Sequence, residues 1–188
     1  MGMAGRPRSF DRDAALAAAI ELFWREGYEE TTVAMLTKAM GVTPPSLYAA
    51  FGDKERLFTE ASSVYFRRTC DAFDSAAARP TAREAIAAML EDTARAHTGA
   101  LTPPGCLMLT EPRLAEQRHE IRRRLVERIR RGVTEGDLPA TVDAEELASF
   151  LLAIMRGMSG RARDGGSTHE LLTIASMAVG AIPSVPAE

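Results

Sequence analysis

Two adjacent prolines, Pro44 and Pro45, stand in a part of the chain whose flanking residues have the spacing of α-helices. Proline is tolerated in the first turn of a helix, because the N–H groups there have no partner within the helix. Thr43 precedes the prolines, and a residue before proline favours the extended dihedrals that suit a helix cap. The prolines therefore predict the stiffened start of a short helix. The residues expected on its inward face are Leu47, Ala50 and Phe51.

A second short helix is expected immediately before this one. Thr31 or Thr32 stands where its cap would be, the segment VAMLTKAM follows, and Gly41 breaks the helix. Two short helices joined by a glycine-containing turn, the second with an exposed N-terminal end, form a helix-turn-helix, whose second helix enters the DNA major groove. We place this motif at about residues 33–52.

Composition indicates that the rest of the chain is helical as well. The 188 residues are 46% hydrophobic but only 6% aromatic, and the strong helix formers alanine, leucine and methionine dominate the apolar set. Alternating β-branched runs are absent from the sequence. We predict an all-α fold of about nine helices, in which an N-terminal three-helix helix-turn-helix DNA-binding domain precedes a helical regulatory and dimerisation domain.

Glycine- and proline-rich breaks such as TPPG, EGDLP and RARDGGS separate the expected helices. The tail PSVPAE has too little apolar content to hold it against a core. The predicted segments are a flexible basic arm at 1–9, a DNA-binding domain at 10–70, a ligand-binding and dimerisation domain at 71–182, and a disordered tail at 183–188.

Membrane, secreted and metal-binding classes find no support in the sequence. No apolar run approaches the ~20 residues of a membrane-spanning helix, and no signal-peptide cleavage pattern follows the alanine-rich N-terminal segment. Cys70 and Cys106 form neither a disulfide framework nor a metal-ligand spacing, so we expect a cytoplasmic protein. His97, His119 and His169 also lack metal-ligand spacing, and neither a metal nor another cofactor is predicted.

The segment TTVAMLTKAMGVTPPSLYAAFGDKERLF resembles the DNA-binding domain of the TetR family of transcriptional regulators. The shared pattern is a capped helix, Gly-Val in the turn, Ser-Leu-Tyr in the second helix, and then Phe, Lys-Glu and Leu. The resemblance covers about residues 9–68, and Thr37 and Met40 depart from it where alanine is more usual. It implies a DNA-binding regulator, most often a repressor that a small apolar effector releases from a near-palindromic double-stranded operator.

Carried over position by position, the resemblance implies two groups of DNA contacts. The residues expected to contact phosphate or sugar are Thr32, Thr43, Ser46, Tyr48 and Lys54, and those expected to meet base edges are Pro44, Pro45 and Ala49. Arg6 and Arg8 would enter a neighbouring minor groove. The second helix has no Arg, Asn or Gln, so bidentate base readout is not available from it. Thymine methyl groups and DNA shape are then the expected sources of specificity.

Charge alone does not indicate DNA binding in this chain. Residues 1–68 carry nine Lys or Arg and nine Asp or Glu, and the whole chain has a net charge of −3. The most basic run, HEIRRRLVERIRR at 119–131, is interpreted as a solvated helix face, with a second nucleic-acid site as the alternative.

The last two expected helices each carry an apolar face, and two such faces exceed what a single helical layer would cover. Pairing with a second copy would bury both in a four-helix bundle, an interface that the resemblance also implies. The residues predicted to form this homodimer interface are Leu147, Leu151, Ile154, Met155, Met158, Leu171, Ile174, Ala175, Ala178 and Ile182.

A small, largely apolar effector is expected to bind inside residues 55–135, where few polar groups interrupt an apolar lining. The predicted lining is Phe66, Met89, Leu90, Thr93, His97, Cys106, Leu107, Met108 and Leu109. For any single one of these residues, filling the core is the simpler interpretation.

Two alternatives stay open. One is a small helical enzyme or carrier that binds an apolar metabolite. No Ser-His-Asp, Cys-His or Gly-rich phosphate motif supports catalysis, so no enzymatic activity is predicted. The other is that Cys70 or Cys106 senses oxidants, against the commoner role of a reduced, packed cysteine.

Overall fold

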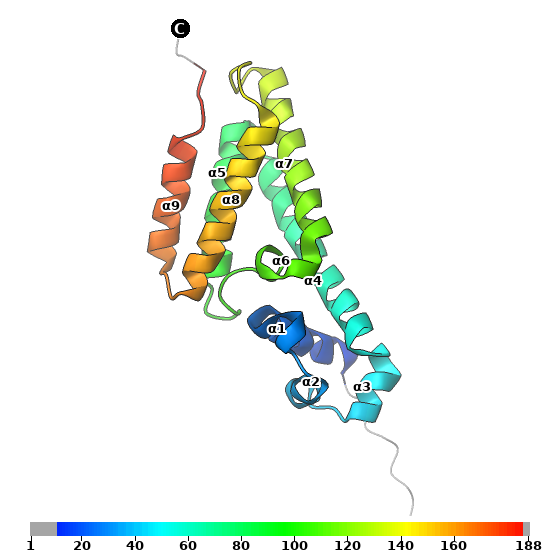
Figure 1. The fold of residues 1–188 in the computed structure, drawn as a ribbon. Helices are drawn as coiled ribbons and strands as arrows, with labels where there is room; N and C mark the ends of the chain where they lie inside the picture. Colours follow the sequence, from blue (N-terminus) through cyan, green and yellow to red (C-terminus); the bar gives the residue numbers. More distant parts are fainter. Residues whose placement is uncertain (1–10, 186–188) are drawn as a thin grey trace, which may run out of the picture. The chain divides into compact units, whose positions relative to one another are not determined.

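The computed structural model describes residues 11–185, and every regular element in that range is helical (Figure 1). Nine α-helices and one short 3-10 helix occur among these residues, which confirms the predicted all-α class and helix number. The chain forms two compact units, an N-terminal unit that ends at Ser63 and a C-terminal unit that begins at Val64. The division lies inside one long helix, whereas the sequence placed the end of the first domain at residue 70.

Each helix of the N-terminal unit begins at a side-chain cap. The helices are α1 (Arg12–Glu30), α2 (Val33–Met40), α3 (Pro44–Phe51) and the first turns of α4 (Lys54–Ala77). The capping oxygens belong to Asp11, Thr32, Thr43 and Asp53, and each accepts a backbone N–H two or three residues ahead. Because a cap satisfies N–H groups that have no partner inside the helix, local chemistry sets all four starts.

The turn between α2 and α3 depends on Gly41, whose φ is 65°. Glycine adopts this left-handed conformation at little cost, and the N–H groups of Gly41 and Val42 bond to carbonyls of the last turn of α2. On α3, Leu47 and Phe51 are buried as predicted, and Ala50 is half-buried. The turn and this inner face hold α3 against α2.

An aromatic cluster forms part of the core of the N-terminal unit. The ring of Phe58 packs edge-on against Phe23 and Tyr28, with centroid distances of 5.1 and 4.9 Å. Gly27, with φ 79° and ψ 173°, bends α1 immediately before Tyr28. Because glycine commonly ends a helix, the sequence by itself predicts an end at Gly27; instead the helix resumes after the bend and continues through Glu30.

Arg12 ties the start of α1 to the other helices of the N-terminal unit. Its guanidinium lies 4.4 Å from the ring centroid of Phe51 and donates two hydrogen bonds to the Glu60 carboxylate, at 2.6 and 2.8 Å. It also donates to the backbone carbonyl of Ala50 at 3.4 Å. The Arg12 side chain thus contacts both α3 and α4. These contacts help to fix the position of α3, whose other face is exposed to solvent.

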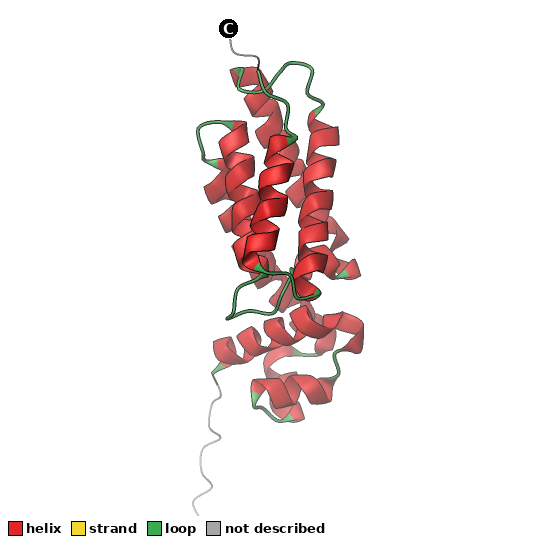
Figure 2. Ribbon diagram, turned by 90° about the vertical axis from the view of Figure 1, so that its left-hand side faces the viewer, coloured by secondary structure: helices red, strands yellow, loops and turns green. Residues whose placement is uncertain are grey.

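The C-terminal unit is a bundle of long helices that lie side by side (Figures 1 and 2). Besides the later turns of α4, it contains α5 (Ala82–His97), α6 (Leu107–Thr110), the 3-10 helix η1 (Pro112–Leu114), α7 (Ala115–Glu135), α8 (Ala144–Arg163) and α9 (Thr168–Gly180). α9 packs against α5, and α7 packs against α8. Helical spacing in the sequence by itself predicts ends of the last two helices near Gly160 and Ile182, and the observed ends are Arg163 and Gly180.

One arginine of the basic run at 119–131 is a core residue. Arg128 is 5% exposed, and its guanidinium donates to the carbonyls of Ala77 and Arg79 at 3.0 Å and of Pro80 at 3.4 Å. These carbonyls end α4 and form the turn before α5, where no helical N–H reaches them. The interpretation of the run as a solvated face is therefore wrong for Arg128, which closes the end of α4.

Candidate nucleic-acid interface

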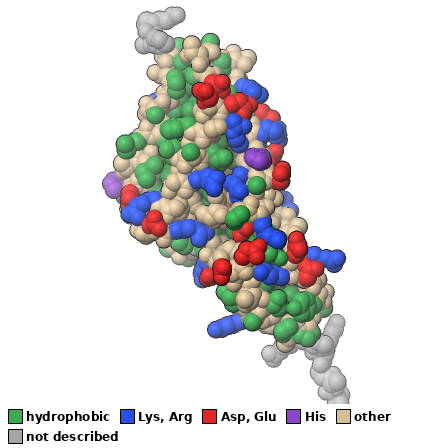
Figure 3. Space-filling view, viewed as in Figure 1, with side chains coloured by type: hydrophobic (Ala, Val, Ile, Leu, Met, Phe, Trp, Pro, Cys, Tyr) green, Lys and Arg blue, Asp and Glu red, His purple; other side chains and the backbone are tan. Residues whose placement is uncertain are grey.

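α3 presents a face without charged side chains to solvent. Its exposed residues, with the cap, are Thr43, Pro44, Pro45, Tyr48 and Ala49. Tyr48 is the largest of them and is 48% exposed. Hydrophobic side chains gather on the surface over α2 and α3 (Figure 3). This face offers two proline rings, a methyl group, an aromatic ring and hydroxyl groups, and it contains neither a guanidinium nor a side-chain amide.

The hydroxyl groups of this surface lie at helix starts. Thr43 Oγ1 accepts the Ser46 N–H at 3.4 Å and lies 2.9 Å from Ser46 Oγ, where either hydroxyl can be the donor. Thr32 Oγ1 accepts the Met35 N–H at 3.2 Å at the start of α2. The positive end of a helix dipole attracts phosphate. Three of the predicted phosphate contacts therefore stand where the backbone itself favours an anion.

Lys54 begins α4, and its ammonium lies 4.2 Å from the ring centroid of Tyr28. Such a cation–π contact restrains a side chain that otherwise has many rotamers, and it leaves the ammonium charge intact. Lys54 is half-buried, so the contact holds one cation at a defined place near the start of α4. Arg6 and Arg8, predicted to enter a minor groove, lie outside the described residues.

The described part of the N-terminal unit is acidic. Residues 11–63 carry five Lys or Arg and nine Asp or Glu, a net charge of −4. The ion pairs of its arginines are Arg12 with Glu60, Arg25 with Glu21 and Arg56 with Asp53. Electrostatic attraction of a polyanion to this part of the unit is therefore weak.

The residues predicted to line an effector pocket lie mainly in the core of the C-terminal unit. The buried members are Met89, Leu90, His97, Cys106, Leu107, Met108 and Leu109, and the half-buried ones are Phe66 and Thr93. Most of them come from α5 and α6, and α6 packs against α7 and α8.

Polar groups from three segments meet at Cys106, beside this apolar set. Tyr65 donates its O–H to Cys106 Sγ at 3.2 Å, and the Cys106 N–H donates to Ser159 Oγ at 2.9 Å. Gly105, with φ 77°, has no room for a side chain, because an added Cβ would lie 2.8 Å from the backbone oxygen and Oγ of Ser159. Sequence analysis missed Tyr65 and Ser159, since both are far from Cys106 along the chain.

Burial controls protonation in this region. It raises the pKa of the Cys106 thiol, and this outweighs the opposing effect of the Tyr65 hydrogen bond, so the thiol is protonated at neutral pH. His97 is 6% exposed, and burial, helped by the nearby charge of Arg163, lowers its pKa to about 4. Its Nδ1 atom is buried and has no hydrogen-bond partner among the described residues. His97 is therefore a neutral side chain with one unused polar atom.

Most of the residues predicted to form a dimer interface are buried within the protomer. The buried members are Leu151, Met155, Met158, Leu171, Ala175, Ala178 and Ile182, whereas Leu147, Ile154 and Ile174 are half-buried. The buried side chains face the core because α8 and α9 both pack against α5. The prediction that these seven residues form a surface toward a second copy is therefore wrong.

A different set of residues on α8 and α9 faces solvent. Phe150 is 38% exposed and Met177 is 72% exposed, an unusual exposure for large apolar side chains. Gly157 is also exposed, and a Cβ added there would meet no atom within 4 Å. Sequence analysis did not select these three residues.

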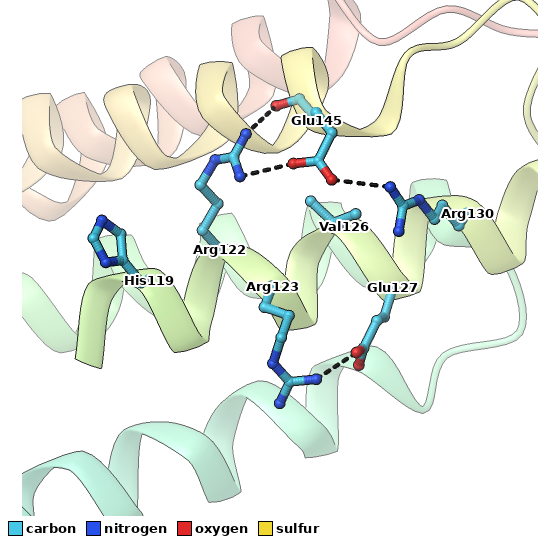
Figure 4. Close-up of a pocket in the computed structure, with 7 residues that line it drawn as sticks. All are labelled: His119, Arg122, Arg123, Val126, Glu127, Arg130 and Glu145. Atoms are coloured by element: carbon cyan, nitrogen blue, oxygen red, sulfur yellow. Dashed lines mark hydrogen bonds and ion pairs between the residues drawn. The ribbon is translucent and has the colours of Figure 1, made fainter. Parts of the chain in front are cut away.

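The outer surface of α7 holds grooves of a polar kind. One, of about 300 Å³, lies between α7 and the start of α8, where Arg122 and Arg130 both bind the Glu145 carboxylate, at 2.7 and 2.9 Å (Figure 4). Arg123 pairs with Glu127 in the same groove. Because carboxylates already neutralise these arginines, this groove does not match the apolar effector site that the sequence predicted.

A second groove, of about 410 Å³, lies between α4 and α7. Arg124 there holds the Asp74 carboxylate at 2.7 Å.

Among the described residues, no helix is both long and apolar enough to cross a membrane.

Two capped helices joined by a turn, the second of which (α3) exposes one face to solvent, are the arrangement found in helix-turn-helix DNA-binding proteins. The chain matches the family described as bacterial regulatory proteins, tetR family, over residues 15–61, and a tetracyclin repressor-like C-terminal domain over residues 109–173. It is 34% identical to the HTH-type transcriptional repressor ComR of Escherichia coli K12, over 91% of this chain and 88% of ComR. It is 29% identical to the repressor BdcR of the same organism, over 96% and 93% of the two chains.

A solved structure is also similar. A cysteine mutant of the TetR family transcriptional regulator CifR, in complex with 26-bp double-strand operator DNA, is 40% identical with a TM-score of 0.87, covering 95% of this chain and all of that one. The chain belongs to the TetR family. Members of this family are DNA-binding transcription factors and not enzymes, and effector-controlled release and dimer formation are typical of them. This confirms the predicted family and the predicted function as a DNA-binding transcriptional regulator.

Proposed function

We propose that this protein is a cytoplasmic homodimeric repressor that binds a near-palindromic operator through α3 and is released by a small apolar effector. The observation that carries this proposal is the outward face of α3, which is anchored from within by Leu47, Phe51 and Arg12. The relatives ComR and BdcR are both named as transcriptional repressors, which favours repression over activation.

The residues that we assign to DNA contact follow from exposure and position. Thr32, Thr43, Ser46, Tyr48 and Lys54 would contact phosphate or sugar, and Pro44, Pro45 and Ala49 would meet base edges in the major groove. Arg6 and Arg8 remain the proposed minor-groove contacts.

For the homodimer, we assign the solvent-facing side of α8 and α9. Its residues are Phe150, Ile154 and Gly157 on α8 and Ile174 and Met177 on α9, all exposed or half-buried in the protomer. Burial of Phe150 and Met177 would supply apolar area, and Gly157 would let two helices approach closely. Two copies of this surface would form the four-helix bundle expected from the sequence.

The effector is proposed to bind beside α6, near the end of α5, and to separate α6 from its neighbours α7 and α8. His97 Nδ1 is one of several buried polar atoms without a partner among the described residues, and it lies beside the predicted apolar lining, so a ligand with one hydrogen-bonding group on an apolar body would fit there. α6 has four residues and ends before Pro112, so it can shift without unfolding a long helix. An effector lowers operator affinity only by its differential affinity for the two states, typically ~1–3 kcal/mol.

The test is footprinting of the full-length protein on DNA fragments from its own gene neighbourhood. Ala49→Glu places a carboxylate on the outward face of α3 and should abolish a footprint that the unaltered protein gives. Ala17→Glu is the matched control, since Ala17 is exposed on α1. A footprint that survives Ala49→Glu, or that Ala17→Glu removes equally, would contradict the assignment of α3.

A further inference from the structure

The chemistry of the α3 surface limits which bases it can distinguish. In the major groove, guanine is read by Arg or Lys, adenine by Asn or Gln, and cytosine by Asp or Glu. None of these residue types stands between Pro44 and Phe51. Thymine is the one base that displays an apolar group, its 5-methyl, at the groove edge. The exposed carbon atoms of the α3 surface therefore complement the thymine methyl group, and the surface has no side chain for bidentate readout of another base.

The hydroxyl groups of Thr43 and Ser46, beside this surface, bond to each other at 2.9 Å. Thr43 Oγ1 also accepts the Ser46 N–H. Their remaining capacity lies at the helix start, where a phosphate is the natural partner. The exposed carbon atoms of Pro44, Pro45 and Ala49 are left for the base edges.

In the described part of the N-terminal unit, attraction between basic side chains and phosphates cannot substitute for contacts with the bases. That part has a net charge of −4, and Arg12, Arg25 and Arg56 pair with carboxylates. Sequence-independent attraction to phosphates is then small, so a larger share of operator affinity must come from contacts in the groove.

We propose that this protein recognises its operator chiefly through thymine methyl groups packed against Pro44, Pro45 and Ala49. The inference rests on the proposed function, because it requires that α3 enters the major groove. It adds the chemical identity of what α3 reads there.

Uracil tests the proposal directly, since it pairs as thymine does and lacks only the methyl group. The full-length protein would first enrich binding sites from a random duplex library. The enriched pool would then be amplified once with dTTP and once with dUTP, and the affinity for both pools measured. Each lost methyl should weaken binding about fourfold, the equivalent of about 0.8 kcal/mol. Two methyls in each of two half-sites should together cost about 250-fold.

A matched pair of variants localises the effect. Ala49→Gly removes the side-chain methyl group that would pack against a thymine methyl. In this variant, replacing the thymine next to residue 49 by uracil should no longer lower the affinity. Ala17→Gly makes the same change on the exposed face of α1 and should leave every uracil penalty as it was. Circular dichroism melting of both variants separates the shared helix cost of glycine, about 0.5–1 kcal/mol, from the binding effect.

The possible results are distinct. An enriched pool that binds equally well with uracil would overturn the inference and leave the proposed function standing. A uracil penalty spread evenly over all thymines of the site would also overturn it, because DNA shape would then be the signal. Failure to enrich any sequence would overturn the proposed function itself.

Discussion

The helices α3 and α7 lie at opposite extremes of charge. α7 carries seven arginines and four glutamates, whereas α3 carries no charged residue at all. On α7, Arg122 and Arg130 share Glu145, Arg124 binds Asp74 and Glu120, and Arg128 closes the end of α4. Both helices have solvent-exposed residues, but the exposed face of α3 carries no ion pair, whereas that of α7 carries several. The role of each arginine in this protein therefore follows from the carboxylates and carbonyls that it binds, and a high density of positive charge does not by itself indicate a binding surface.

The difference between inner and outer positions is sharpest on α8, where two neighbouring residues have opposite surroundings. Leu151→Glu would bury a carboxylate in the core and should destabilise the protein by more than about 4 kcal/mol, enough to abolish folding. Phe150→Glu, best combined with Met177→Glu, should instead give a folded monomer in sedimentation velocity. A dimer that persists in the exposed double variant would remove the assigned dimer face.

Among the arginines of α7, the structure predicts very unequal contributions to stability. Arg128→Met leaves three backbone carbonyls without their donor and should lower the free energy of unfolding by about 3 kcal/mol, measured by urea denaturation. Arg131→Gln removes an exposed pair with Glu135 and should cost less than about 1 kcal/mol. Equal effects of the two changes would show that burial does not separate these arginines.

His97 gives the C-terminal unit a dependence on pH. Its folded-state pKa of about 4 is below its ordinary value of 6.5, so between these values the unfolded state binds more protons than the folded state. Stability should therefore fall as pH drops from ~6.5 to ~4, by up to about 1.4 kcal/mol for each pH unit. His97→Leu should flatten this part of a pH–stability curve measured by urea denaturation. A curve that is unchanged in the variant would assign the slope to other groups.

The smallest expected effect concerns the one cation held at the start of α4. Lys54→Ala should weaken operator binding about tenfold, as the loss of one charged hydrogen bond does, and to a similar extent for all operator sequences. The slope of log affinity against log salt should fall in magnitude by about one. Tyr48→Phe should weaken binding without changing the slope, because it removes no charge. Sequence-selective loss with Lys54→Ala would place Lys54 at a base edge.

Most of the N-terminal unit could be predicted from sequence because its signals are local. A cap, a glycine turn and two prolines each act within four residues, so the start of α3 follows from Thr43 and the prolines, and that of α2 was narrowed to Thr31 or Thr32, of which the structure shows Thr32 to be the cap. The sequence identifies Gly27 as an interruption of α1, but it does not show that the helix resumes afterwards. Positive φ at glycine is readable from sequence, but the return to helix afterwards depends on packing around Tyr28.

The C-terminal unit was less predictable, since its roles depend on contacts between distant segments. Helical spacing correctly groups Leu151 with Met155 and Met158, but it cannot tell whether that face meets α5 or a second copy. Isolated exposed residues such as Phe150 and Met177 make no pattern at all. Burial in three dimensions was needed to separate the two faces.

The rigid start of α3 has a consequence for the kinetics of DNA binding. A proline pair behind a hydrogen-bonded Thr43 has few conformations to lose, so contact with DNA requires little ordering of this segment. Association should then proceed at a rate set by diffusion and orientation, without the large heat-capacity change of coupled folding. Differences in affinity among operator variants should appear almost entirely in how long each complex lasts.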